Sequence, residues 1–281
     1  MGLSAANLNV LLSLYKDEFF VNSQSVIELG SQNLQDDGNT SFIINHINGD
    51  NNLKSNEIKS ARDFYNALGF SDYQCIDPDL RHKAHNIDLN EIIDEPSLKN
   101  AFDLVTNFGT SEHCFNQNNC FLNIHNFCKV GGLMVHGLPF QGALNEGLIN
   151  YQPNFFFCLA SANNYEIIGT YINLNGFAGD LIPYSDQLMK VLKLPDSSIP
   201  TTSIIVVLKK IEHENFRTPW NSKYLGTCKF EKYQFQKETE YFLPVPVKEL
   251  STWNHFEHIM KRVKSVGILN SIKRFFFFRN K

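Results

Sequence analysis

The sequence predicts an α/β fold built on a doubly wound, mostly parallel β-sheet. Short apolar segments typical of buried strands alternate along the chain with segments whose apolar residues follow helical spacing. Polar or glycine residues stand at the ends of four strand candidates, at Gly30, Asp77, Asp88 and Asn107. Because ligands bind at the carboxyl ends of the strands in such sheets, this ordered set is the strongest functional signal in the sequence.

The composition narrows the class of protein. Of the 281 residues, 43% are hydrophobic and 13% aromatic, which is enough for a substantial core and argues against disorder. The formal net charge of −4 does not favour nucleic-acid binding. No apolar run reaches the roughly 18 residues of a membrane-spanning helix, and residues 1–20 lack a signal-peptide pattern. Six cysteines without C-x-x-C spacing predict reduced thiols, so we expect a cytoplasmic protein without a zinc site.

A helix and a strand begin the fold. Apolar residues recur at helical spacing over 8–20, and a short buried strand begins at Ser25 and runs into a turn at Gly30. Residues 33–57 are rich in Asn, Asp and Gly, which predicts a long loop or insertion that is able to act as a lid.

The middle of the chain continues the alternation. A helix is expected over 57–68, with Gly69 as its stop signal, and a strand over 73–77 ends on an acid. Residues 84–88 repeat that strand pattern more weakly. The remaining expected elements are strands over 101–107, 133–136, 165–174 and 203–211, a helix over 118–128, and a helix beginning at Asn154.

The acids at the strand ends have two interpretations. Asp77 can accept two hydrogen bonds from the hydroxyls of a ribose, and Asp88 or Leu89 can meet the edge of an adenine. Alternatively, each acid is the N-cap of the following helix, which is the commoner role for an Asp after a strand. The ordered set favours a bound cofactor over four independent caps.

From about residue 25 to 211, the chain resembles the class I S-adenosylmethionine-dependent methyltransferases. The resemblance is carried by the runs Ile27-Glu-Leu-Gly30, Cys75-Ile-Asp77, Ile87-Asp-Leu-Asn90 and Phe102-Asp-Leu-Val-Thr-Asn-Phe-Gly109. The later stretches 129–136 and 165–168 also fit. Within that superfamily, the runs over 106–113, 136–139 and 150–153 are similar to a little-characterised bacterial subgroup.

The resemblance implies a Rossmann-like, seven-stranded sheet with one antiparallel strand near its C-terminal edge, and S-adenosyl-L-methionine as cofactor. It implies that Glu28 and Gly30 shape the loop around the methionine part, that Asp77 holds the ribose, and that Asp88 and Leu89 flank adenine. It also implies that residues 107–109 line the floor near the sulfonium. The expected cofactor-binding residues are Glu28, Gly30, Ser31, Gln32, Asp77, Asp88, Leu89, Asn107, Phe108 and Gly109.

The glycine loop departs from the family pattern of two or three glycines, because Ser31 and Gln32 follow Gly30. A methionine carboxylate needs less close backbone approach than a pyrophosphate, so one glycine suits this cofactor better than NAD. The absence of Gly-x-Gly-x-x-Gly counts against the first alternative, an NAD(P)-linked nucleotide-sugar oxidoreductase. The thin loop supports the second alternative, a non-catalytic scaffold with a methyltransferase-like fold.

Three residues are candidates for catalysis of methyl transfer, in which the enzyme orients a nucleophile and accepts its proton. Glu112 and His113 follow the fourth strand and His136 ends the fifth, so all three are expected to face one cleft. Histidine is the natural base near neutral pH. Structural roles for each remain the alternative. A metal bound by this set is a weaker one, because the chain lacks tight ligand spacing; we expect no metal.

The acceptor and partner regions are expected after the fifth strand and at the C-terminus. Gln141, Asn150 and Tyr151 suit a hydroxylated acceptor, such as a small molecule or glycan precursor. We divide the chain into a methyltransferase domain over 1–215 and an extension over 216–281. Residues 261–281 contain seven basic and no acidic residues among apolar ones, which suits a terminal helix docked on the domain or on a second subunit of a homodimer. Peripheral contact with an anionic membrane is the alternative.

Overall fold

The computed structural model describes residues 2–48, 57–173, 181–185, 189 and 201–220. The basic segment 261–281, and with it most of the expected C-terminal extension, lies outside the described residues. Within the described residues, no helix is long and apolar enough to cross a membrane.

A seven-stranded sheet forms the centre of the fold, with the strand order β4-β2-β5-β6-β9-β7-β8. Its strands are β2 (Ser25–Leu29), β4 (Asp72–Ile76), β5 (Phe102–Phe108), β6 (Cys128–Gln141), β7 (Glu166–Asn173), β8 (Ile182–Pro183) and β9 (Thr202–Lys209). The strands β4, β2, β5 and β6 pair in parallel, whereas β9 runs antiparallel to both β6 and β7. The short β8 is also antiparallel to β7. The mostly parallel, seven-stranded α/β sheet is therefore confirmed, and two strands, β9 and β8, run antiparallel to the other five, where one antiparallel strand was expected.

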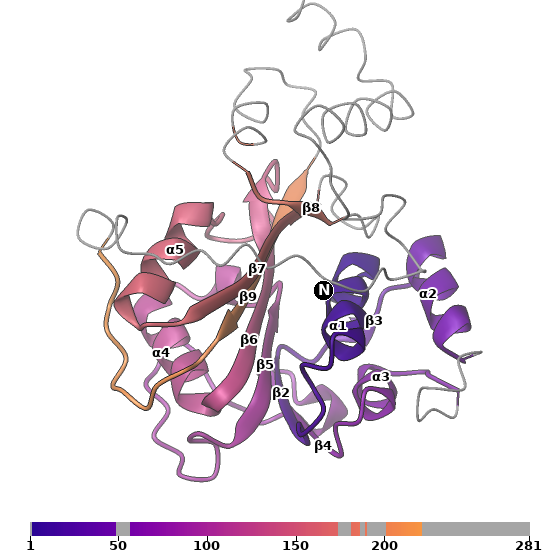
Figure 1. Ribbon diagram of the computed structural model, residues 1–281, viewed down its shortest axis with the longest axis horizontal. Helices are drawn as coiled ribbons and strands as arrows, with labels where there is room; N and C mark the ends of the chain where they lie inside the picture. The colour runs from indigo at the N-terminus through magenta and orange to yellow at the C-terminus, as the bar shows by residue number, and fades with distance from the viewer. Residues whose placement is uncertain (1, 49–56, 174–180, 186–188, 190–200, 221–281) are drawn as a thin grey trace, which may run out of the picture.

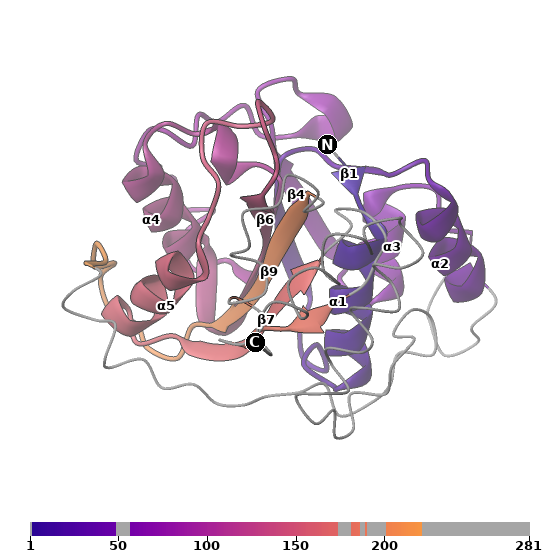
Figure 2. The ribbon, with the colours of Figure 1, turned by 90° about the horizontal axis from the view of Figure 1, so that it is seen from above.

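Helices cover both faces of this sheet, as a doubly wound fold requires. They are α1 (Ala5–Lys16), α2 (Gly38–Asn48), α3 (Ala61–Ala67), α4 (Gln117–Phe127) and α5 (Pro153–Ala162). Figures 1 and 2 show α1, α2 and α3 on one face and α4 and α5 on the other. Each group packs its apolar residues against the sheet in a separate core cluster. A two-residue parallel pairing joins β1 (Gly2–Leu3) to β3 (Asn33–Leu34) beside the main sheet.

Most expected elements are present with shifted ends, and the shifts follow from capping. The N-terminal helix begins after Ser4, whose Oγ accepts a hydrogen bond from the Asn7 amide. The helix expected from residue 57 begins only after Ser60, whose Oγ accepts from the Asp63 amide. That helix stops as expected at Gly69, which has a φ of +102°.

The loop expected over 33–57 is wrong in its first half, where the structure contains α2. Asp37 caps this helix by accepting hydrogen bonds from the amides of Asn39 and Thr40. The helix buries four residues at the spacing i, i+3, i+4 and i+7: Thr40, Ile43, Ile44 and Ile47. The Asn, Asp and Gly residues on either side of these positions obscure the helical spacing in the sequence. The helix packs against α1 in the apolar core cluster on that face of the sheet.

The weak strand expected over 84–88 is also wrong. It forms a single parallel bridge, between Ile76 and His85, and no strand. Leu80, His82 and Lys83 all have positive φ values just before it, so the chain arrives in a tight left-handed turn that does not continue into extended pairing. The seventh strand of the sheet is instead β8.

Candidate functional site

The carboxyl ends of β4, β2 and β5 surround a cavity of about 310 Å³. The chain leaves β2, returns through α2 and α3 to pair on one side as β4, and then crosses to the other side as β5. Strand order therefore reverses at β2, and such a switch point is where open α/β sheets bind ligands. The volume is at the lower end of the range of about 300–1,000 Å³ for small-molecule sites.

The cavity brings together eight of the residues predicted from sequence. They are Gly30, Ser31, Gln32, Asp77, Asp88, Leu89, Gly109 and His113. The remaining predicted residues, Glu28, Asn107, Phe108, Glu112 and His136, do not line it. Sequence reasoning missed Thr110 and Cys114, which extend the run after β5, and Arg81, which follows the turn after β4. Thr110 and Cys114 stand next to predicted residues in the sequence, whereas no such signal marks Arg81.

Asp77 ties the turn after β4 to the turn after β2. Its Oδ2 accepts a hydrogen bond of 2.8 Å from the Ser31 amide, and its Oδ1 accepts one of 3.0 Å from the Asp79 amide. The bond to Asp79 closes a local turn, so Asp77 is no cap of a long helix. A carboxylate offers about four acceptor positions, which leaves room for two further donors such as hydroxyls.

Asp88 and Leu89 form the far wall of the cavity with complementary properties. Asp88 is exposed, and its Oδ1 accepts hydrogen bonds of 2.8 Å from both the backbone and the side-chain nitrogen of Asn90. These bonds lower the pKa of the Asp88 carboxyl, which is therefore ionised at neutral pH. Leu89 is buried, and together with Ile87 it gives the wall an apolar surface suited to a planar ring.

Glu28 supports the turn after β2 from beneath. Its fully buried carboxyl group accepts hydrogen bonds from the hydroxyls of Tyr73 (2.7 Å) and Tyr65 (3.1 Å) and from the Gln32 amide (3.2 Å). Burial raises the pKa of Glu28 to about 8, although these donors oppose the rise. The expected role in shaping the loop is compatible with this position, whereas direct contact with a ligand in the cavity is not.

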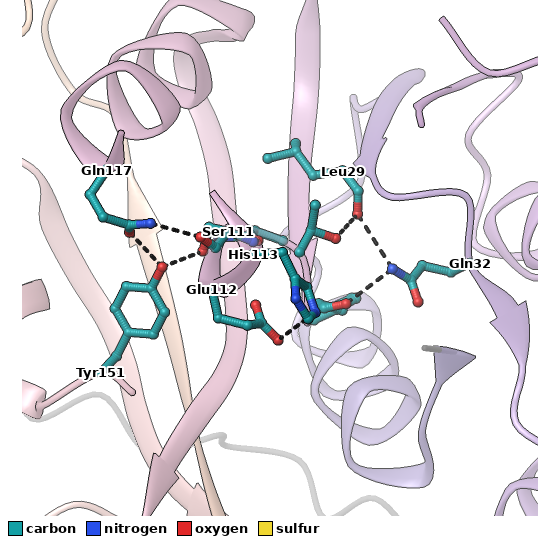
Figure 3. Close-up of polar contacts among 10 residues, drawn as sticks. Leu29, Gln32, Ser111, Glu112, His113, Gln117 and Tyr151 are labelled. Atoms are coloured by element: carbon teal, nitrogen blue, oxygen red, sulfur yellow. Dashed lines mark hydrogen bonds and ion pairs between the residues drawn. The ribbon is translucent and has the colours of Figure 1, made fainter. Parts of the chain in front are cut away.

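The side chains of Thr110 and Gln32 lie against the turn at Gly30, which has a φ of +79°. A Cβ at this position would lie 2.6 Å from Thr110 Oγ1 and 2.7 Å from Gln32 Nε2, so only glycine fits. Thr110 Oγ1 donates to the Leu29 carbonyl at 2.7 Å. Gln32 Nε2 donates to the carbonyl of Phe108 at 3.0 Å and to that of Leu29 at 3.4 Å. Figure 3 shows the bond between Gln32 and Leu29.

Glu112 and His113 meet at the rim of the cavity, in the 3₁₀ helix Ser111–His113. Glu112 Oε1 lies 4.0 Å from His113 Nε2, and Figure 3 shows the carboxylate pointing toward the imidazole. Only 2% of Glu112 is exposed, and burial raises its pKa to about 7. The His113 side chain is 48% exposed and lines the cavity. A buried acid thus stands behind an accessible imidazole.

His136 lies elsewhere, in the core between α4 and α5. Its ring packs against those of Phe121 and Phe156, with centroids 5.5 and 5.3 Å away, and its Nδ1 is 3.2 Å from Asn107 Nδ2. Burial lowers the pKa of His136 to about 3, so the imidazole is neutral. The expectation that His136 shares one cleft with Glu112 and His113 is therefore not met.

Asn107 and Tyr151 belong to a buried hydrogen-bond network that holds the 3₁₀ helix in place. Asn107 Nδ2 donates to Ser111 Oγ at 2.8 Å, and the Tyr151 hydroxyl contacts Ser111 Oγ at 2.9 Å and Gln117 Oε1 at 2.5 Å (Figure 3). Tyr151, which the sequence suggests as a contact for a hydroxylated acceptor, is thus buried within this network. Gln141 is half-buried and Asn150 exposed, and neither lines the cavity.

His82 and His85, which follow Asp77 in the sequence, each contact an amide side chain. His82 Nε2 contacts Asn33 Oδ1 and His85 Nε2 contacts Gln74 Oε1, each at 2.9 Å on the exposed surface. Among the residues that the structure describes, no group of three His, Cys, Asp or Glu side chains is placed to hold a metal ion.

Comparisons with known proteins identify similar structures only. The sequence matches no protein-family model and no curated protein. The trans-methyltransferase CalH, solved with S-adenosylhomocysteine, is 12% identical with a TM-score of 0.37 over 73% of this chain, and the match spans 55% of CalH. An O-methyltransferase of a Brevibacillus brevis polyketide multienzyme is 14% identical with a TM-score of 0.44, covering 78% of this chain and 77% of that one.

A third similar structure is a putative sarcosine dimethylglycine methyltransferase from Galdieria sulphuraria. It is 12% identical with a TM-score of 0.44, covering 72% of this chain and 84% of that one. Likeness at these scores carries no argument about function, which must rest on the geometry of the site.

Proposed function

We propose that this protein transfers a methyl group from S-adenosyl-L-methionine to a small molecule or a glycan precursor. The observation that carries the proposal is the cavity at the strand switch point. It joins an acid with free acceptor positions, an apolar wall and an imidazole backed by a buried carboxyl group. S-adenosylmethionine supplies a methyl group on a positively charged sulfur, which a nucleophile can attack directly.

The residues present fit the nucleoside part of this cofactor. Asp77 has two acceptor positions left for the two hydroxyls of a ribose. Ile87 and Leu89 provide an apolar surface for the base, and the ionised Asp88 can accept from an exocyclic amine at its edge. The turn over residues 30–32 would then face the methionine part.

Glu112 and His113 would orient the acceptor and take its proton. A base is most effective when its pKa is close to the working pH. His113 is accessible from the cavity, so it would receive the proton, and the Glu112 carboxylate would stabilise the resulting imidazolium. The pKa of Glu112, near 7, makes this support depend on pH within the physiological range.

A second candidate function, a non-catalytic scaffold, is favoured by one observation. Gln32 and Thr110 fold over the only glycine of the turn, where a methionine part would have to approach the backbone. The acceptor, a homodimer and a membrane contact through 261–281 remain proposals, and the last depends on residues outside the described ranges.

The test of cofactor binding is calorimetric titration with S-adenosylhomocysteine, NAD and NADP on the wild type, Asp77→Asn and Asp77→Ala. Asp79→Ala is the matched control, because Asp79 is an exposed acid of the same turn that does not line the cavity. We expect micromolar binding of S-adenosylhomocysteine that weakens at least about tenfold in both Asp77 variants, the cost of one charge-assisted hydrogen bond. Binding of a dinucleotide in its place would move the function to redox chemistry.

Turnover separates the enzyme from the scaffold. Cofactor binding without methyl transfer to any of a panel of hydroxylated and amino acceptors would support the scaffold. Failure of the wild type to bind S-adenosylhomocysteine would contradict the methyltransferase proposal altogether.

A further inference from the structure

The Gln32 side chain spans the switch point between β2 and β5. Its Nε2 donates to the carbonyl of Leu29, the last residue of β2, and to that of Phe108, the last residue of β5. Gln32 is only 4% exposed, yet it lines the cavity. The Gln32 side-chain amide therefore hydrogen-bonds both strand-end carbonyls, at the position where sheets of this kind bind ligands.

The orientation of this amide is fixed by its surroundings. If Oε1 and Nε2 were exchanged, the amide oxygen would face two carbonyl oxygens, with no donor among them. In the observed orientation, Oε1 is buried and has no hydrogen-bond partner among the described residues. A buried acceptor without a donor carries a desolvation penalty, so this position of Gln32 is only partly satisfied. Such a side chain can be displaced by a ligand that supplies better donors.

Gly30 makes this arrangement possible. A Cβ on residue 30 would lie 2.7 Å from Gln32 Nε2, so any other residue would force the amide away from the carbonyls. The single glycine of the turn thus accommodates the Gln32 side chain, where further glycines would leave the turn open to a ligand.

We infer that Gln32 is a specificity-determining residue that competes with the amino-acid tail of a nucleoside ligand. The carbonyls of Leu29 and Phe108 are acceptors suited to a primary ammonium group, which has three N–H donors. A nucleoside without such a tail, such as adenosine or 5′-methylthioadenosine, needs no movement of Gln32. A nucleoside that carries an amino-acid tail binds fully only after Gln32 leaves the two carbonyls.

This inference rests on the proposed function, because it concerns the same cavity and the same class of ligand. Displacing Gln32 breaks one good hydrogen bond and one long one, which corresponds to a loss of about tenfold in affinity. The wild type should therefore gain little affinity from the tail. Removing the Gln32 side chain should increase the affinity for a nucleoside that carries the tail.

The experiment measures the affinities of adenosine, 5′-methylthioadenosine and S-adenosylhomocysteine by calorimetry for the wild type, Gln32→Ala and Gln32→Met. Methionine keeps the length of the side chain and lacks its donors, and it carries the test if the alanine variant does not fold. Gln24→Ala is the matched control, since Gln24 is exposed at the opposite end of β2. Thermal melting verifies that each variant is folded.

In the wild type, we expect S-adenosylhomocysteine to bind less than about tenfold more tightly than 5′-methylthioadenosine. Both Gln32 variants should bind S-adenosylhomocysteine about tenfold more tightly than the wild type does, while their affinity for 5′-methylthioadenosine should stay within about twofold of the wild-type value. If the wild type binds S-adenosylhomocysteine about a hundredfold or more tightly than 5′-methylthioadenosine, the inference is overturned without any variant. Variants in which the ratio of the two affinities is unchanged would also overturn it. In both cases the proposed function stands. If none of the three nucleosides binds any of the proteins, the proposed function and the inference fall together.

Discussion

Glu112 Oε1 lies 4.0 Å from Nε2 of His113, and the two side chains differ greatly in exposure. The second oxygen of Glu112, Oε2, is buried and has no hydrogen-bond partner among the described residues. Burial therefore disfavours the ionised carboxylate, and a protonated Glu112 is favoured in the folded protein up to about neutral pH.

Glu112 should make the folded protein less stable as the pH rises. Its pKa is about 7 in the folded protein and near 4.5 when exposed, so its stabilising contribution is present in full below pH 4.5 and is lost as the pH rises to about 7. The loss is at most about 3 kcal/mol of unfolding free energy. Urea denaturation at pH 5 and pH 8 should show a smaller pH dependence for Glu112→Gln than for the wild type.

Glu91→Gln is the control for this measurement, because Glu91 is exposed. It should leave the pH dependence of stability unchanged. An identical pH dependence in Glu112→Gln and the wild type would show that Glu112 is ionised in the folded state at neutral pH.

Tyr73 should stabilise the fold through Glu28. Its hydroxyl donates the shortest of the three hydrogen bonds to that carboxyl group, at 2.7 Å. Tyr73→Phe leaves one buried oxygen with only the Gln32 amide as donor, so we expect a loss of about 1–3 kcal/mol of unfolding free energy and a higher pKa for Glu28. Because Tyr65 donates to the same group at 3.1 Å, the combined loss in Tyr65→Phe, Tyr73→Phe should differ from the sum of the single losses. Strict additivity in denaturant titrations would contradict a shared network.

The sequence predicts the sheet better than the site, and the reason lies in what each depends on. The strand before Gly30 is recognised because a mostly apolar run suits a strand that is buried on both faces, as β2 is in the structure. Burial also makes the prediction for His136 wrong. This residue follows Val135 in β6, and its ring lies on the face of the sheet that α4 and α5 cover. Polar residues at strand ends are expected to face a ligand, whereas the His136 ring packs in the core, where its Nδ1 contacts Asn107 and its Nε2 has no hydrogen-bond partner among the described residues.

Side-chain conformation explains the second kind of failure. That Gln32 follows Gly30 is visible in the sequence, but its bond to the Phe108 carbonyl joins residues 76 positions apart. The pairing exists only because β2 and β5 are neighbours in the sheet. No local pattern encodes that contact, so the thin glycine loop can be noticed from sequence while its physical cause cannot.

Lys210 should be important for stability despite its distance in sequence from the elements it joins. Its buried ammonium group donates to the carbonyls of His125 (2.8 Å) and Cys128 (2.9 Å), at the C-terminus of α4, and to Asn100 Oδ1 (3.0 Å). A cation at this end of a helix also interacts favourably with its dipole. Lys210→Met keeps most of the packing and leaves these acceptors unpaired, so we expect a loss of about 2–4 kcal/mol of unfolding free energy. The neighbouring Lys209→Met should cost less than about 1 kcal/mol, and equal losses in the two variants would contradict the proposed role.

His113 should be required for methyl transfer and dispensable for cofactor binding, if the proposed function is right. His113 is accessible from the cavity, and its Nε2 lies 4.0 Å from Glu112 Oε1. His113→Ala removes the proposed proton acceptor, so we expect kcat to fall about 10²–10⁴-fold while the affinity for S-adenosylhomocysteine changes less than about fivefold. His113→Gln should behave similarly, because an amide cannot take the proton. His46→Ala is the control, since His46 is exposed on α2, away from the cavity. If kcat is retained in His113→Ala while the pH profile is unchanged, His113 is a wall of the cavity and the base must be another group.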